Sequence, residues 1–119
     1  MDLTLNTDLG KLNIRVAAWI ESQNNILVSK FPGGINSLPG GRVKFTETTL
    51  EAIKREVLEE TGEELYEIEL FSVIENFFLE KNNQRKIFMN FYSCIKEKLK
   101  NGKSIPALII LIKILYGNL

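Results

Sequence analysis

The sequence contains no histidine and only one cysteine, Cys94. A single thiol cannot form a disulfide within the chain, and there is no cluster of cysteine and histidine that could hold zinc. Acid–base chemistry would therefore depend on carboxylates, lysine, tyrosine or water. Cys94 itself lies in an apolar segment, which favours a packing role over a reactive one.

An excess of charge is also absent, because 15 basic residues balance 15 acidic ones. A neutral chain is not expected to bind nucleic-acid polymers or membrane surfaces, since such binding rests on excess positive charge. The N-terminal segment lacks a basic region followed by an apolar run, so no signal peptide is expected and a cytoplasmic protein is predicted. Apolar residues make up 45% of the 119 residues, which is enough for the core of one domain.

Strand and turn signals dominate the N-terminal part. Residues 1–10 are polar and are expected to form an irregular lead-in. Residues 12–22 and 26–31 contain alternating, β-branched and aromatic residues, and they predict a hairpin. Residues 32–41 contain two Pro-Gly-Gly triplets and predict a structured loop, because proline and glycine supply the backbone angles that turns need.

A helix is predicted for residues 48–61. Thr48 followed by Glu51 fits a capping box at its start, and Gly62 fits the residue that ends a helix. The apolar positions that share one face of this helix are Leu50, Ile53 and Val57, with Leu58 beside them.

The C-terminal part predicts a second hairpin and then changes in composition. Residues 68–80 and 85–95 are rich in β-forming residues and flank a turn-like KNNQ segment. The basic stretch 96–104 predicts a solvated loop. The last segment, 105–119, is strongly apolar but shorter than the roughly 20 residues that span a bilayer. We expect it to be buried in the core or against a second copy of the chain, and we therefore predict a homodimer.

Nine of the thirteen glutamates fall between residues 47 and 69. On the predicted helix, Glu56, Glu59 and Glu60 share one face, and like charges at these spacings destabilise a helix slightly. They also lie near the helix C-terminus, where the helix dipole disfavours anions. Binding of Mg²⁺ or Mn²⁺ would reverse both effects, because these ions prefer oxygen ligands. The alternative is an ordinary solvated acidic face.

The spacing of these residues favours the first interpretation. Five residues separate Gly41 from Glu47, and seven more lead to the run REVLEETG over residues 55–62. This string resembles the Nudix box, the signature of the Nudix hydrolases, which has glycine, glutamate, arginine and aliphatic positions at the same spacing. One position departs from the signature, because Glu63 stands where the family has an aliphatic residue. The resemblance covers residues 12–97.

The resemblance implies an α/β fold, a Nudix-type α/β/α sandwich with a mixed β-sheet, in a single domain over residues 1–119. In the family, a further strand and a closing helix usually follow the second hairpin. Here the atypical apolar tail 105–119 takes their place, so we expect a C-terminal part that is shortened relative to the family.

The resemblance also implies metal-dependent hydrolysis, by water attack, of a pyrophosphate bond in a nucleoside diphosphate linked to another moiety. Glu56, Glu59, Glu60 and the Gly41 carbonyl would hold Mg²⁺ or Mn²⁺, and the backbone of Gly40 and Gly41 would approach the substrate. Substrate candidates are nucleoside triphosphates, including oxidised ones, nucleotide sugars such as ADP-ribose, and dinucleoside polyphosphates. The base, sugar and leaving group stay open.

Arg55 and Glu47 would support the site, with Arg55 pairing with a carboxylate so that loop and helix meet in one way. The alternative for Arg55 is a surface pair with Glu59, worth only about 0.3–0.5 kcal/mol. Glu56 is the first candidate for the catalytic base, with Glu59 as its rival. Some family members recruit an acid from a later loop, for which the candidates here are Glu75, Glu80 and Glu97.

One or two aromatic residues are expected to stack on a nucleobase, while most pack in the core. The candidates are Trp19, Phe77, Phe78, Phe88, Phe91 and Tyr92. Two other functions stay open: a catalytically impaired Nudix fold that binds nucleotides or proteins, and a purely structural interaction module. The structural module would leave the intact box unexplained.

Overall fold

The computed structural model describes residues 1–22, 25–31, 35–79, 86–97 and 108–113. Its main sheet is built from β1 (Thr4–Asn6), β2 (Gly10–Trp19), β7 (Gly40–Arg42), β8 (Ile68–Leu79), β9 (Ile87–Glu97) and β10 (Leu108–Lys113). The shorter strands are β3 (Glu21–Ser22), β4 (Asn25–Ile26), β5 (Ser29–Phe31) and β6 (Ile35–Ser37). The helix is α1 (Thr49–Thr61).

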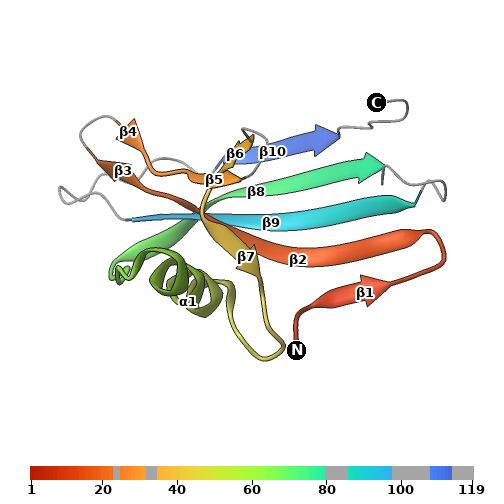
Figure 1. Ribbon diagram of the computed structural model, residues 1–119, viewed down its shortest axis with the longest axis horizontal. Helices are drawn as coiled ribbons and strands as arrows, with labels where there is room; N and C mark the ends of the chain where they lie inside the picture. Colours follow the sequence, from red (N-terminus) through yellow and green to blue (C-terminus); the bar gives the residue numbers. More distant parts are fainter. Residues whose placement is uncertain (23–24, 32–34, 80–85, 98–107, 114–119) are drawn as a thin grey trace.

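The main sheet is mixed, with the order β1-β2-β9-β8-β10 and with β7 paired to β2 (Figure 1). β2 runs parallel to β9 and β10 runs parallel to β8, whereas β8 and β9 form an antiparallel hairpin. This hairpin confirms the second one predicted from the sequence. A mixed sheet with a helix packed on it is the predicted α/β arrangement, and α1 is the one helix in the described part of the chain.

α1 begins and ends where its sequence predicts. The Glu51 backbone N–H donates a hydrogen bond of 3.1 Å to the Thr48 hydroxyl, which satisfies one of the free donors at the start of the helix. Gly62 ends the helix in a left-handed conformation with a φ of 76°, which glycine adopts without strain. The predicted buried face was partly wrong, because Leu50 and Leu58 are 38% and 46% exposed.

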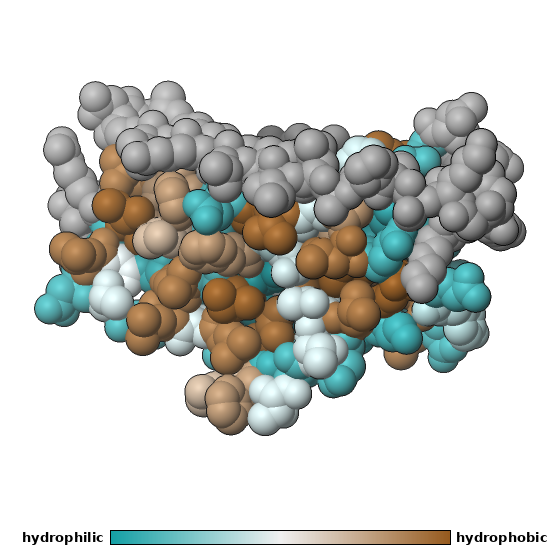
Figure 2. Space-filling model, turned by 180° about the vertical axis from the view of Figure 1, so that it is seen from behind, coloured by the Kyte–Doolittle hydropathy of each residue, from teal (hydrophilic) through white to brown (hydrophobic). Residues whose placement is uncertain are grey.

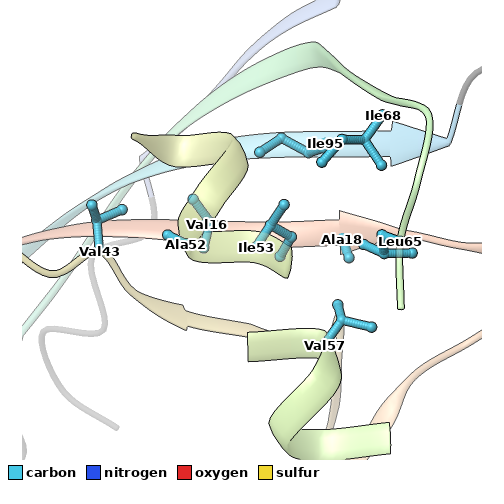
Figure 3. Close-up of a cluster of buried hydrophobic side chains, with 9 residues drawn as sticks. All are labelled: Val16, Ala18, Val43, Ala52, Ile53, Val57, Leu65, Ile68 and Ile95. Atoms are coloured by element: carbon cyan, nitrogen blue, oxygen red, sulfur yellow. The ribbon is translucent and has the colours of Figure 1, made fainter. Parts of the chain in front are cut away.

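The core lies between α1 and one face of the sheet (Figure 3). Ile53 and Val57 of α1 belong to one buried cluster with Val16 and Ala18 of β2 and Ile95 of β9. Burying one such aliphatic side chain contributes about 1.5–3 kcal/mol to stability. α1 is therefore held by this face, and the glutamates on its other faces are directed away from the core.

Ala52 is buried on α1 together with Ile53 and Val57, although the sequence did not indicate it. Its side chain is fully buried and belongs to the cluster that joins α1 to the sheet. Leu50 lies two positions earlier on the helix, about 200° around the axis from Ala52. The buried face of α1 is therefore formed by Ala52, Ile53 and Val57, and Leu50 lies at its margin in the first turn of the helix.

The prediction of an irregular lead-in for residues 1–10 is wrong. Thr4–Asn6 form β1, which pairs antiparallel with residues 11–13 of β2, and Gly10 already belongs to β2. The Thr7 hydroxyl closes the turn between the two strands by accepting two backbone N–H bonds, at 3.2 and 3.1 Å. Polar residues hid this strand because a short edge strand exposes much of its surface and tolerates them.

The first hairpin is shorter, and the segment after it more regular, than the sequence predicted. β3 and β4 pair over two residues each, and β5 then pairs with β6. Residues 32–41, expected to be a loop, contribute both β6 and β7 in their described part. The Ala18 backbone N–H donates a bond of 2.8 Å to the Pro39 carbonyl, just before β7 pairs with β2. Backbone pairing with β2 therefore outweighs the turn preference of this glycine-rich segment.

The apolar tail is described over β10, whose backbone lies parallel to β8 as the last strand of the sheet order. The side chains of β10, residues 105–107 and 114–119 and the predicted loop from residue 98 onward lie outside the description. Burial of the tail and the homodimer therefore stay predictions. Among the described residues, no helix has the length and apolar character needed to cross a membrane.

Large apolar side chains also reach the surface. Seen from behind Figure 1, hydrophobic residues occupy much of the visible face (Figure 2). Independently of this view, the exposed large apolar side chains in the described part of the chain include Leu5 at 57%, Leu9 at 81% and Phe45 at 62%. Apolar surface of this kind supports association with another surface, and it does not identify that surface.

Candidate active site

Two consecutive glycines bring the backbone of β7 against both the sheet and α1. Gly40 pairs with Ala17 of β2, and a Cβ at Gly40 would lie 2.0 Å from the Val16 carbonyl oxygen. A Cβ at Gly41 would lie 2.4 Å from Oε1 of Glu56. The first glycine therefore permits strand pairing, and the second leaves room for a carboxylate of the helix.

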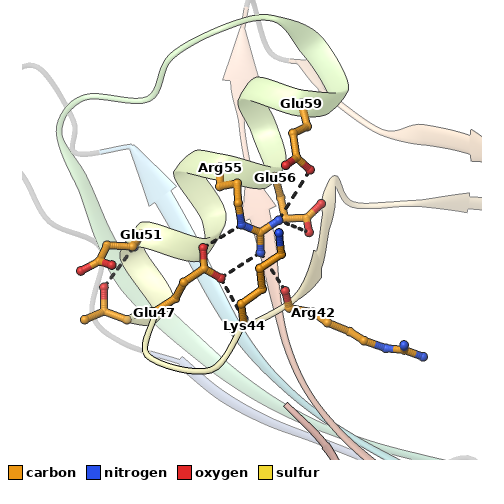
Figure 4. A network of polar contacts seen from close by, with 8 residues as sticks. Arg42, Lys44, Glu47, Glu51, Arg55, Glu56 and Glu59 are labelled. Atoms are coloured by element: carbon orange, nitrogen blue, oxygen red, sulfur yellow. Dashed lines mark hydrogen bonds and ion pairs between the residues drawn. The ribbon is translucent and has the colours of Figure 1, made fainter. Parts of the chain in front are cut away.

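Arg55 is the centre of a polar network that joins α1 to the segment before it (Figure 4). Its Nε and Nη2 donate to the two carboxylate oxygens of Glu47 at 2.7 and 2.9 Å. Its Nη1 donates to Oε1 of Glu56 at 2.8 Å, and Nη2 also donates to the Arg42 carbonyl at 3.0 Å. A planar guanidinium with several partners holds the helix and the loop in one relative orientation.

Glu47 is held from both sides, by the guanidinium and by its own loop. The Lys44 backbone N–H donates to Oε1 of Glu47 at 2.8 Å, and Thr46 between them has a φ of 77°. Such a φ is uncommon for a β-branched residue, so the surrounding bonds stabilise a strained turn. The hydrogen bond from Arg55 lowers the pKa of Glu47 to about 2, and the same pair raises the pKa of Arg55. Both groups are therefore charged at neutral pH.

The positive charge of Arg55 does not balance the acidic face of α1. Glu47 takes two of its bonds and Glu56 a third, while Oε2 of Glu59 lies 3.5 Å from Nη1. The Glu59 side chain is 57% exposed, compared with 16% for Glu56. With Glu60 at the end of the same face, four carboxylates lie near two cations, Arg55 and Lys44, whose charge also acts on Glu47, and a surplus of negative charge remains. Both interpretations of Arg55 from the sequence, the support of the loop and the pair with Glu59, have a contact in the structure.

Glu60 lies at the end of this acidic face. Burial raises its pKa, and the negative charges of Glu56 and Glu59 raise it further. Hydrogen bonds from the Gly40 backbone N–H and the Ser29 hydroxyl act in the opposite direction. Glu60 is therefore a partly desolvated carboxylate that β7 and β5 hold in place.

The donor chemistry of this face fits a hard divalent cation, because it offers carboxylate oxygens with unneutralised charge. Within the described ranges, no three acidic, histidine or cysteine groups are already gathered closely enough to hold an ion. The reason is visible in Figure 4, where the Glu56 and Glu59 side chains are turned toward Arg55. Glu56, Glu59 and Glu60 are thus the residues that could hold a metal, with Gly41 beside them.

Glu60 and several residues of the sheet line one pocket of about 250 Å³. Val16 and Ala18 face α1, so their neighbours Arg15 and Ala17 on β2 face the opposite side of the sheet. The pocket is lined on that side by residues of β2, β8 and β9, and at its edge by Gly40 and Glu60. The lining residues are Arg15, Val16, Ala17, Ser29, Ser37, Leu38, Gly40, Glu60, Ile74, Asn76 and Tyr92.

The other acidic candidates from the sequence are not brought to this pocket. Ile74 and Asn76 line it, so Glu75 between them points to the other side of β8. Glu97 is exposed at the end of β9, and Glu80 lies outside the described residues.

Of the aromatic candidates, Tyr92 lines the pocket. Phe78 and Phe88 pack edge to face with centroids 5.0 Å apart, and Trp19 packs at 6.0 Å against Phe71, which was not among the candidates. Cys94 is buried, as its apolar segment suggested, and burial raises the pKa of its thiol to about 11. It is therefore a thiol and not a thiolate at neutral pH.

Reasoning from the sequence missed Arg15, Asn76 and Ser29 as candidates near the site. A signal was present for two of them, since Arg15 and Asn76 interrupt strands that are otherwise mostly apolar. Ser29 carried no signal, because serine is common near turns.

A family model described as the NUDIX domain matches residues 11–106. The chain belongs to the NUDIX domain family. In this NUDIX-domain chain, the signature runs from β7 through the Glu47 loop to the end of α1, which are the elements that Arg55 joins.

Two similar proteins are 8-oxo-dGTP diphosphatases. The one from Buchnera aphidicola subsp. Acyrthosiphon pisum is 39% identical over 71 residues, which cover 60% of this chain and 52% of that protein. The one from Proteus vulgaris is 26% identical over 87 residues, which cover 69% and 78%. The match thus spans about half the length of the Buchnera protein.

Solved structures show the same fold. The mutator MutT protein from Bacillus halodurans superimposes with a TM-score of 0.57 at 24% identity, over 71% of this chain and 55% of that one. At this identity the likeness concerns the fold alone, and it agrees with the mixed sheet and helix described above.

Proposed function

We propose that this NUDIX-domain chain hydrolyses a pyrophosphate bond of a nucleotide, with Mg²⁺ or Mn²⁺ bound at the acidic face of α1. The observation that carries the proposal is the surplus of negative charge on this face, since Glu47 already neutralises Arg55. Carboxylates without a matching cation, beside a pocket, suit an ion that also contacts phosphate oxygens.

Glu56, Glu59, Glu60 and the Gly41 carbonyl would hold the ion. When bound, the ion would neutralise phosphate oxygens and lower the pKa of the attacking water. Glu56 stays the first candidate for the base that takes the proton of this water. Glu59 is its rival, because its 57% exposed side chain has room to turn toward a substrate. Gly40 and Gly41 would let the substrate approach the backbone of β7.

Arg55 and Glu47 would act as positioning residues. Their paired contacts at 2.7 and 2.9 Å tie the loop to the helix, and the bond from Arg55 to Glu56 sets where that carboxylate lies. Loss of this arrangement would misplace the reacting groups, and small errors in position reduce rates strongly.

The names of the two similar 8-oxo-dGTP diphosphatases support a nucleoside triphosphate, including an oxidised one, as the substrate. Nucleotide sugars and dinucleoside polyphosphates are the other classes to test. We also infer that the chain is cytoplasmic and forms a homodimer through its apolar tail, a state that size-exclusion chromatography at several concentrations would measure.

The test is a screen of phosphate and pyrophosphate release with the purified full chain. The panel contains dGTP, 8-oxo-dGTP, dATP, ADP-ribose and a dinucleoside polyphosphate, each with Mg²⁺, with Mn²⁺ and with a chelator. We expect metal-dependent pyrophosphate release from at least one triphosphate. Binding of Mn²⁺ and nucleotide without any hydrolysis would favour a binding module instead.

A further inference from the structure

The pocket beside Glu60 contains a cationic side chain that the acidic face does not use. Arg15 of β2 and Tyr92 of β9 are directly opposite one another in the parallel pair. The Arg15 guanidinium lies over the Tyr92 ring, 5.6 Å from its centroid, and both residues line the pocket. This cation–π contact favours a guanidinium placed over the ring, at the wall of the pocket.

Arg15 lacks an acceptor for one of these donors. Its Nε is buried and has no hydrogen-bond partner in the described part of the chain. A buried donor without a partner destabilises a fold, so its presence in the pocket suggests that a ligand supplies the acceptor. Arginine only donates hydrogen bonds. A ligand that pairs with this N–H group must therefore carry a hydrogen-bond acceptor.

A second polar group in the pocket is also without a partner. The Asn13 side-chain amide donates a hydrogen bond of 2.9 Å to the side-chain oxygen of Asn90, so these two residues are already paired with each other on this side of the sheet. Asn76 is opposite Asn90 in the β8–β9 register and lines the pocket, yet its side chain makes no hydrogen bond with another described residue. The pocket therefore offers donors from Arg15 together with a free amide from Asn76.

We propose that Arg15, placed over the Tyr92 ring, contacts the base of the nucleotide and selects guanine over adenine. Unoxidised guanine presents two adjacent acceptors, O6 and N7, and this pair matches two parallel N–H groups of arginine, whereas 8-oxoguanine keeps only the O6 acceptor because its N7 carries a hydrogen. Adenine has an amino group in place of O6, which would face the arginine with a second donor. The Asn76 amide and the apolar wall at Ile74 would complete the contact with the base.

The size and place of the pocket agree with this role. Its volume of about 250 Å³ is slightly below the range of roughly 300–1,000 Å³ typical of ligand sites, which suits a base rather than a whole nucleotide. Glu60 lies at its edge, so the phosphates would extend toward the acidic face. A test of base selection by reaction rates rests on the proposed function, because it requires hydrolysis. A test by binding of nucleoside monophosphates does not require hydrolysis.

The test compares kcat/KM for dGTP and dATP in the wild type and in Arg15→Met and Arg15→Lys. A bidentate contact discriminates by about 1–3 kcal/mol, so we expect a preference of about 5- to 150-fold for dGTP in the wild type. Arg15→Met should bring the ratio close to one by lowering kcat/KM for dGTP. Arg15→Lys keeps the charge but loses the fork, and it should also lose most of the preference.

The matched control is Lys11→Met. Lys11 lies on the same strand and over the Phe88 ring at 5.8 Å, as Arg15 lies over Tyr92, but it does not line this pocket. The ratio of dGTP to dATP should be unchanged in this variant. Thermal melting checks that each variant folds. If Arg15→Met does not fold, the comparison of Arg15→Lys with the wild type tests the role of Arg15.

Binding of GMP and AMP, measured by calorimetry, separates the two proposals. Absence of hydrolysis for every nucleotide would contradict the proposed reaction. Base selection would still be supported if the wild type binds GMP more tightly than AMP and both Arg15→Met and Arg15→Lys lose this difference. A wild type without preference for guanine, or a preference that both Arg15 variants retain, would overturn the assignment of Arg15. Loss of the preference in Lys11→Met as well would overturn it too, because charge on the sheet would then be the cause.

Discussion

The Glu56 carboxylate lies directly against the α-carbon of Gly41, so that a Cβ at this position would be 2.4 Å from Oε1. The contact joins β7 to α1 at the centre of the proposed site. Because the obstructing atoms belong to the end of a flexible side chain, a larger residue at 41 would move Glu56 and leave the backbone in place.

We therefore expect Gly41→Ala to lower kcat/KM at least about ten-fold while changing the melting temperature by only a few degrees. Gly40→Ala is the contrasting variant, since its Cβ would lie 2.0 Å from a backbone carbonyl of β2 that cannot turn aside. It should destabilise the whole fold. Steady-state kinetics and thermal melting of both variants measure the difference, and equal loss of stability in the two would contradict it.

Glu56→Gln and Glu60→Gln should each lower kcat roughly 100-fold or more, the scale expected when a stabiliser of the transition state is lost. Without metal, their stability should change little or rise slightly, because repulsion between like charges is relieved. Kinetics with Mg²⁺ and denaturant titrations in chelator measure the two effects.

The control for these variants is Glu67→Gln, an exposed position after the helix. Glu69 is unsuitable, because it lies 3.5 Å from Nζ of Lys96, whose side chain is 4% exposed. If Glu56→Gln turned over substrate as fast as Glu67→Gln, the acidic face would be a solvated surface and nothing more.

Arg55→Ala should destabilise the fold by about 1–3 kcal/mol, because it leaves the partly buried Glu47 and Glu56 without their charged donor. Glu59→Ala should change stability by no more than about 0.5 kcal/mol, since this exposed side chain contributes a single longer contact. Urea unfolding of the two variants separates a positioning role of Arg55 from a surface pair. Similar values for both would indicate the surface pair.

Stability should fall as the pH is lowered from about 4.5 to about 2. The pKa of Glu47 is lowered to about 2 in the folded chain, so its ionised form favours folding above pH 4.5. This contribution disappears as the carboxylate is protonated across that interval. Glu47→Gln should be less stable than the wild type at pH 6, and the difference between them should shrink toward pH 2. A difference independent of pH would show that packing, and not charge, is the reason.

The sequence by itself determined the helix and its acidic face. Thr48 and Gly62 lie next to the helix ends that they close, and the common face of Glu56, Glu59 and Glu60 follows from 3.6 residues per turn. These features depend on neighbours within one or two turns. For the same reason the spacing from Gly41 to Gly62 was enough to indicate the family.

Only the tertiary structure decided what the helix faces and what completes the pocket. The cation–π contact of Arg15 with Tyr92 depends on a parallel register between strands that are far apart in the chain. The bond of Ser29 to Glu60 likewise depends on how β5 lies beside α1. Strand order and register are set by packing of the whole core, and short-range patterns do not specify them. The sequence alone therefore does not predict contacts between residues that are distant in the chain, and the tertiary structure is needed to identify them.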